Sequence, residues 1–172
     1  MGFYKVALYM ALLFVFSASC KKDEPSRPDY VGTWTAIKFV PVAGEITPVM
    51  DVMSFTEMSF FDALQLKLPD DQWTDYISMK GSVSVQGNKM SLAITEAGIY
   101  AFDSETGLPT GVVTRYKAGS AELDLLLSVS GQPKAFDSEY SVSGNKLTLV
   151  TDYNVNGVFG DEFETTVYTR FQ

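Results

Sequence analysis

The sequence predicts an all-β fold, an antiparallel up-and-down barrel of about eight to ten strands. Apolar and polar residues alternate with a period of two in stretches such as 64–68, which is typical of a strand with one buried face. Two segments, 83–95 and 140–152, centre on Gly-Asn-Lys, and Gly-Asn is a favoured two-residue hairpin turn. Turn residues recur at 103–109 and 130–133. Because neighbouring segments join through short turns, adjacent hairpins are favoured over a Greek key.

The N-terminal residues are expected to form a leader that precedes the fold. Lys5 is followed by an uncharged apolar run over 6–16, which is too short to cross a hydrocarbon core of about 30 Å as a helix. Small residues at 17–19 then lead to Cys20, the one cysteine of the chain. This order resembles the lipobox of bacterial lipoproteins, and the resemblance implies that Cys20 is acylated and becomes the first mature residue. The alternative is a buried cysteine of the mature domain.

A polar segment follows Cys20 and lacks the apolar surface that would offset the entropy of ordering, so we expect a flexible tether. Its sequence at 21–24, Lys-Lys-Asp-Glu, is similar to the export signal of Bacteroidota surface lipoproteins; the alternative is a solvated linker without an address function. The resemblance implies a protein anchored by lipid to the bacterial outer membrane, with its periplasmic or extracellular orientation left open. The expected organisation is a signal peptide (1–19), an acylated cysteine with its tether (20–30) and one barrel domain (31–172).

Composition restricts the classes of function. The chain has a formal net charge of −8, which disfavours nucleic-acid binding through phosphate contacts. An anionic membrane surface would also repel such a chain, so the acyl group is expected to hold it at the membrane. Histidine is absent, which removes the commonest general base and zinc ligand, and the one thiol is assigned to the anchor. We therefore expect neither an enzyme nor a bound cofactor, and no protein partner is identified.

The Gly-Asn turns also fix the register of the two hairpins. In the first, Val85 is expected opposite Met90, and Val83 opposite Leu92. In the second, the expected pairs are Val142 with Leu147 and Tyr140 with Leu149. The alternation of Leu123, Leu125, Leu127 and Val129 predicts another strand, whereas 69–81 offers a cap, a short body and a glycine stop, which indicates a helical turn or two. Further strands are expected at 33–40, 55–61, 98–103, 111–117 and 163–171.

Gly32-Thr33-Trp34 opens the first expected strand directly after the tether. An early Gly-x-Trp before a meandering β-chain resembles the lipocalins, and more closely the lipocalin-like (calycin) domains of Bacteroidota lipoproteins. The resemblance implies that Trp34 plugs the closed end of the barrel and that Arg170, near the end of the last strand, packs against it. Thr151-Asp152-Tyr153 also spells the middle lipocalin motif. The alternative is that Trp34 is an ordinary core aromatic of another β-fold.

Aromatic and methionine residues crowd the first half of the domain. An eight-stranded barrel can hold one small ligand, and methionine suits an adaptable apolar surface. We therefore expect a small apolar or amphipathic ligand; the alternative is a barrel filled by its own side chains, in a structural or interaction protein. The candidate ligand-binding residues are Phe55, Met58, Phe60, Trp73 and Tyr76.

The loop 152–162 is a candidate calcium site. Asp152, Asn154 and Asn156 place oxygen ligands at alternate residues, and Gly157 stands at the bend, as in the first half of a calcium-binding loop. The second half of that pattern does not match. The alternative is an Asn-Gly hairpin turn.

Overall fold

The computed structural model describes residues 28–42, 45–152, 155–160 and 164–171 of the chain. The described residues form nine strands and one helix. In chain order these are β1 (Gly32–Val42), β2 (Glu45–Phe55), β3 (Ser59–Lys67), β4 (Trp73–Gln86), β5 (Lys89–Phe102), β6 (Pro109–Lys117), α2 (Ala121–Ser130), β7 (Ala135–Ser143), β8 (Lys146–Thr151) and β9 (Thr165–Arg170).

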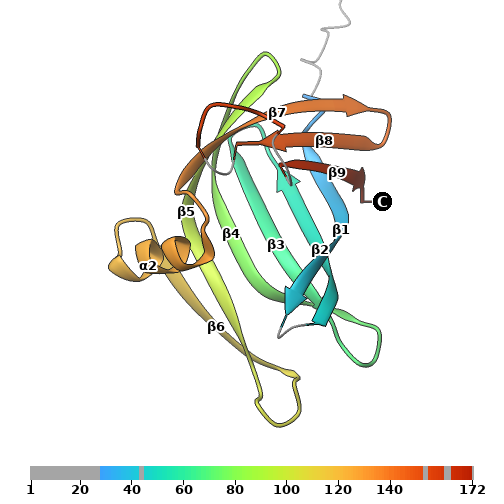
Figure 1. The fold of residues 1–172 in the computed structure, drawn as a ribbon, viewed down its shortest axis with the longest axis vertical. Helices are drawn as coiled ribbons and strands as arrows, with labels where there is room; N and C mark the ends of the chain where they lie inside the picture. The colour runs from blue at the N-terminus through green and yellow to red at the C-terminus, as the bar shows by residue number, and fades with distance from the viewer. Residues whose placement is uncertain (1–27, 43–44, 153–154, 161–163, 172) are drawn as a thin grey trace, which may run out of the picture.

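The strands form one antiparallel sheet that closes into an eight-stranded barrel, which confirms the predicted fold class. The order is β4-β3-β2-β1-β9-β8-β7-β5-β6, and pairing of β4 with β5 closes the barrel. The extra strand, β6, exists because β5 changes its partner along its length. Residues 89–93 of β5 pair with β7, and residues 96–102 pair with β6. Figure 1 shows β7, β8 and β9 together at one end of the long strands, with β6 extending from the other end of β5.

Both Gly-Asn hairpins have the predicted register. Val85 pairs with Met90 and Val83 with Leu92, while Tyr140 pairs with Leu149 in the second hairpin. The turn glycines have positive φ, 64° at Gly87 and 61° at Gly144, a conformation that glycine adopts without a steric cost. Local turn chemistry and the apolar pattern agree here, so the sequence alone was sufficient.

The prediction of a strand over 122–129 is wrong, because this segment is the helix α2. The Ser120 side chain accepts a hydrogen bond from Leu123 N, and Gly131 ends the helix in the left-handed conformation at φ 69°. Leu123 and Leu127 are buried in the barrel core, whereas Leu125 is exposed. The two leucines that face the core are therefore four residues apart, which is the spacing of one side of a helix. The cap at Ser120 and the stop at Gly131 were the signals that favoured a helix.

Two other expectations need correction. The predicted helical turn over 69–81 is wrong, since β4 begins at Trp73 and runs through Gly81. Gly81 is not a stop: a Cβ there would lie 2.7 Å from Phe60 Cε1 and would also clash with the backbone of Ala93. The predicted strand over 55–61 is two strand ends joined by a turn, because β2 ends at Phe55 and β3 begins at Ser59. The rest of β2 was not predicted.

The core fills the barrel at the end where β1 begins, which we call the base. Trp34, Met90 and Leu147 have no exposed surface, and Tyr168 is 1% exposed. The helix α2 adds Leu123 and Leu127 to this same cluster. Within the described part of the chain, no helix has both the length and the apolar character needed to cross a membrane.

Candidate functional site

A tryptophan and an arginine close the base of the barrel. Trp34 pairs in register with Arg170, and the guanidinium carbon lies 4.2 Å from the centroid of the indole ring. Trp34 Nε1 donates to Tyr30 O at 2.8 Å, so the buried indole N–H is satisfied. Arg170 Nη2 donates to Asp29 O at 2.8 Å. The guanidinium therefore joins the last strand to the chain entering the first, which is the contact that the lipocalin resemblance implies.

The structure explains why residue 32 is a glycine. Its φ is 144°, and a Cβ would lie 3.0 Å from Arg170 Nη1.

The packed domain begins earlier than expected. Tyr30, which was expected to lie in the tether, is 3% exposed and belongs to the core. Its ring contacts those of Phe55 and Tyr140 edge-on. The base is thus a packed plug that joins the entering chain to the last strand.

A polar cluster lies on the inner face of the barrel, beyond the base. Asp51 is 2% exposed, and its Oδ2 accepts a hydrogen bond from the Tyr168 hydroxyl at 2.8 Å. The same oxygen forms an ion pair of 2.5 Å with Lys38 Nζ, and the lysine side chain remains 31% exposed. Asp62 is hydrogen-bonded to Asp51. We call Lys38, Asp51, Asp62 and Tyr168 the inner polar cluster.

The inner polar cluster favours the protonated form of Asp62. Burial is the main cause that raises the pKa of Asp62 well above 3.8, and the neighbouring Asp51 carboxylate raises it further. Lys38 opposes this effect and lowers the pKa of Asp62 by a smaller amount. Oδ1 of Asp51 and Oδ1 of Asp62 are buried and accept no hydrogen bond from another residue. A proton kept on Asp62 and donated to Asp51 avoids two buried negative charges side by side.

This proton makes stability depend on pH. Because the folded state binds it more tightly than the unfolded state, its contribution is complete below the unfolded pKa and is lost as the pH rises through the raised folded pKa. Asp62→Asn is therefore expected to flatten the fall in the free energy of unfolding across this window. Urea denaturation at a series of pH values measures the slope. Asp70→Asn, in an exposed turn, is the control; an unchanged slope in Asp62→Asn would contradict the assignment.

The inner polar cluster was not predicted, although the sequence contains a signal for it. Asp51 stands between Val49 and Met53 in the alternation of β2, and Asp62 stands between Phe60 and Leu64 in β3. Charged residues at positions that should face inward are expensive to bury and therefore indicate an interior polar site. Which charges meet depended on strand pairing, because Lys38, Asp51 and Tyr168 come from three strands.

Apolar side chains beyond the inner polar cluster are less completely covered than those at the base. Asp51, Leu64, Ile77 and Ile99 are successive register partners across the inner face. The three apolar members of this row are only partly buried, as is Leu66, one strand position further from the base. By contrast Phe55 and its partner, which form a row at the base, are each 3% exposed. Val49, the register partner of Leu66, is nevertheless 3% exposed. The interior therefore changes from a filled base to a region where buried and partly exposed apolar side chains are mixed.

The structure does not bring the five candidate ligand-binding residues together. Phe55 and Phe60 are register partners at the base and belong to the filled core. Met58 lies in the β2–β3 turn and is 77% exposed. Trp73 begins β4 at the opposite end of the β3–β4 pair, and Tyr76 is 48% exposed and packs near Phe102. Phe55 and Phe60 line one surface pocket of about 580 Å³, but Met58, Trp73 and Tyr76 do not border it.

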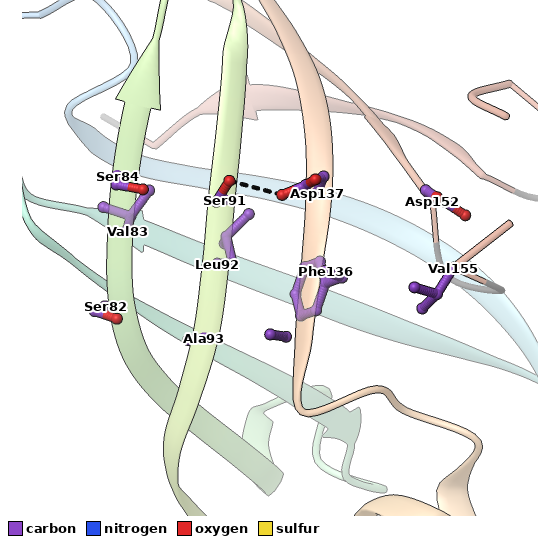
Figure 2. A pocket seen from close by; sticks show the side chains of 11 residues that line it. Ser82, Val83, Ser84, Ser91, Leu92, Ala93, Phe136, Asp137, Asp152 and Val155 are labelled. Atoms are coloured by element: carbon purple, nitrogen blue, oxygen red, sulfur yellow. Dashed lines mark hydrogen bonds between the residues drawn. The ribbon is translucent and has the colours of Figure 1, made fainter. Parts of the chain in front are cut away.

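A groove of about 380 Å³ lies on the outer face of β4, β5 and β7 (Figure 2). Exposed serines line it, and Ser91 donates to Asp137 Oδ1 at 2.7 Å. Val155 and Asp152 border the groove from the segment that follows β8. Because the serine side chains point away from the barrel core, this groove is separate from the interior surface.

The structure shows a local role for Asp152. Both carboxylate oxygens accept backbone hydrogen bonds, Oδ1 from Asn156 N at 3.0 Å and Oδ2 from Gly157 N at 2.8 Å. Asn156 Oδ1 in turn accepts from Val158 N. Asn154 and Tyr153 lie outside the described residues, as does Cys20. Among the residues that are described, no three His, Cys, Asp or Glu side chains form a group able to hold a metal ion; calcium binding stays an untested prediction.

None of the protein-family models matches the chain, and none of the curated proteins does so. Among solved structures, the chain is similar to the crystal structure of an uncharacterized protein from Bacteroides eggerthii DSM 20697. The two sequences are 10% identical, and the match covers 83% of this chain and 100% of that chain with a TM-score of 0.43.

Proposed function

We propose that this chain is a non-catalytic outer-membrane lipoprotein, anchored through an acylated Cys20, whose lipocalin-like barrel binds a small apolar or amphipathic ligand. The ligand would occupy the inner surface beyond the inner polar cluster. Apolar side chains there supply contact area, and Lys38 offers a partly exposed ammonium to a polar group.

The observation that carries this proposal is the change in burial along the inner face. Leu64, Leu66 and Ile77 point inward yet remain only partly buried, although apolar side chains gain free energy when water is removed from them. A ligand bound at this surface would complete that burial. The cluster of Lys38 and Asp51 lies at its border, where it would orient an amphipathic molecule.

A second candidate, a structural or interaction lipoprotein, is favoured by the filled base. Leu123 and Leu127 of α2 insert into the barrel core, and the largest side chains of the base have almost no exposed surface. A barrel filled in this way throughout would act through its outer surface.

Binding of the fluorescent fatty acid cis-parinaric acid distinguishes the two candidates. Leu66→Trp places a bulky ring on the partly exposed inner surface and is expected to weaken binding about tenfold. Ser84→Trp, at an exposed outward position of β4, is the matched control and should bind as the wild type does. Absence of binding, or equal loss in both variants, would favour the second candidate. Native mass spectrometry of protein from its own host would detect a retained ligand.

A further inference from the structure

The outer surface of the barrel is divided by charge. Strand register assigns the outward positions of β8, β9, β1, β2 and β3, because their inward partners include buried residues such as Trp34, Met53 and Leu147. In the part of these five neighbouring strands whose side chains the structure describes, which leaves out 40–42 and 45, no outward position carries a carboxylate, although the chain has a net charge of −8. The next strand, β7, already has two outward carboxylates, Asp137 and Glu139.

The same surface exposes large apolar side chains. Phe39 is 69% exposed, Ile46 is 72% exposed and Phe171 is 64% exposed. Lysines border it at Lys67 and Lys146. We call this surface the carboxylate-free face; its exposed apolar side chains are Ile37, Phe39, Ile46, Phe61, Val167 and Phe171.

The chain enters the domain beside this face. Arg170 holds Asp29 at the start of β1, and Phe171 N donates to Thr33 O on the same pair of strands. Pro28 lies eight positions after Cys20, and this length of chain spans at most about 28 Å when fully extended. β1, with eleven residues, has a length of about 36 Å. An acyl group on Cys20 would therefore keep the face close to the bilayer surface.

We infer that the carboxylate-free face rests on the lipid bilayer to which Cys20 is anchored; this inference rests on the proposed lipid anchor. An acidic protein is repelled by anionic headgroups, so the side that meets them should lack carboxylates. Exposed aromatic and aliphatic side chains favour the boundary between headgroups and acyl chains. Lys146 adds attraction at its border, whereas Lys67 is paired with the exposed Asp71 carboxylate at 2.8 Å.

The face is slightly smaller than one side of a stable protein interface, and the expected tether favours a membrane over a second copy of the chain. The five strands contain 43 residues, or about 140 Å of strand, and at a spacing of about 4.8 Å they cover on the order of 700 Å². A stable protein interface needs about 800 Å² on each partner. A tethered domain needs much less intrinsic affinity, since the anchor makes docking intramolecular.

The single cysteine makes a direct test available. With Cys20 acylated, Ile37→Cys introduces a unique free thiol on the carboxylate-free face, and Ser84→Cys introduces one on the opposite outer surface. Each full-length lipoprotein is labelled with an environment-sensitive fluorophore and reconstituted in vesicles of phosphatidylethanolamine and phosphatidylglycerol. Quenching by lipids brominated in their acyl chains is measured. We expect a blue shift and about threefold stronger quenching at position 37 than at position 84.

Each outcome is decisive. Co-flotation with the vesicles reports the anchor, so flotation with equal quenching at the two positions overturns the docking inference alone. Failure of the wild-type chain to float overturns the anchor and the docking inference together. A blue shift at position 37 that appears without vesicles and grows with protein concentration assigns the face to a second copy and also overturns the inference. Thr169→Cys, on the neighbouring strand β9, repeats the measurement at a second exposed position.

Discussion

Replacement of Trp34 by alanine is expected to lower the free energy of unfolding by about 4 kcal/mol, because the indole has no exposed surface and its removal leaves a large cavity. The change also removes the surface on which the Arg170 guanidinium rests and the hydrogen bond to Tyr30 O. Urea denaturation followed by circular dichroism measures the loss. An effect of this size is a large fraction of the stability of a typical single domain.

Two variants show whether this loss comes from the plug at the base. Trp73→Ala removes the other tryptophan, which is only partly buried, and is expected to cost less than half as much. Arg170→Met keeps the indole but removes its cationic neighbour and the bond to Asp29 O, and should cost about 1–2 kcal/mol. Equal losses in Trp34→Ala and Trp73→Ala would refute a special role for the base.

Replacement of Lys38 by methionine is expected to lower the free energy of unfolding at neutral pH by about 3 kcal/mol. Asp51 would then be buried without its cation, and removal of one partner of a buried ion pair leaves the desolvation cost uncompensated. The hydrogen bond from Tyr168 offsets only part of that cost. Urea denaturation at neutral pH measures the difference.

The matched control is Lys89→Met. Lys89 Nζ lies 3.9 Å from Glu139 Oε1 in an ion pair whose side chains are both substantially exposed, so its loss should cost less than about 1 kcal/mol. A double variant, Lys38→Met with Asp51→Leu, removes both charges and is expected to recover most of the stability lost in the single variant. Similar losses in Lys38→Met and Lys89→Met would show that the inner ion pair is effectively solvated.

Local sequence patterns correctly predicted those elements that depend only on residues close together in the chain. The pairing of Val83 with Leu92 follows from a two-residue turn at Gly87 and from the requirement that apolar residues share one face. The contact between Trp34 and Arg170 lies at a much greater sequence separation, and family resemblance rather than local pattern pointed to it.

Local patterns were misleading where two structures compete for the same residues. The leucines over 123–127 fit a period of two on paper, yet Leu123 and Leu127 face the core from a helix capped at Ser120. The segment 73–81 is flanked by residues typical of helix ends, yet Ile77 pairs with Leu64 and Ile99 in the sheet. Pairing with the preceding and following strands, β3 and β5, outweighed weak local preference in the second case.

The sequence by itself determined the β class and the register of both Gly-Asn hairpins, because alternation and turn chemistry act over a few residues. Only the tertiary structure decided that β5 would change partners, that α2 would enter the core, and that Lys38, Asp51, Asp62 and Tyr168 would meet inside the barrel. Those features depend on contacts between strands far apart in the chain. Barrel closure brings these residues together, and no short stretch of sequence carries that information.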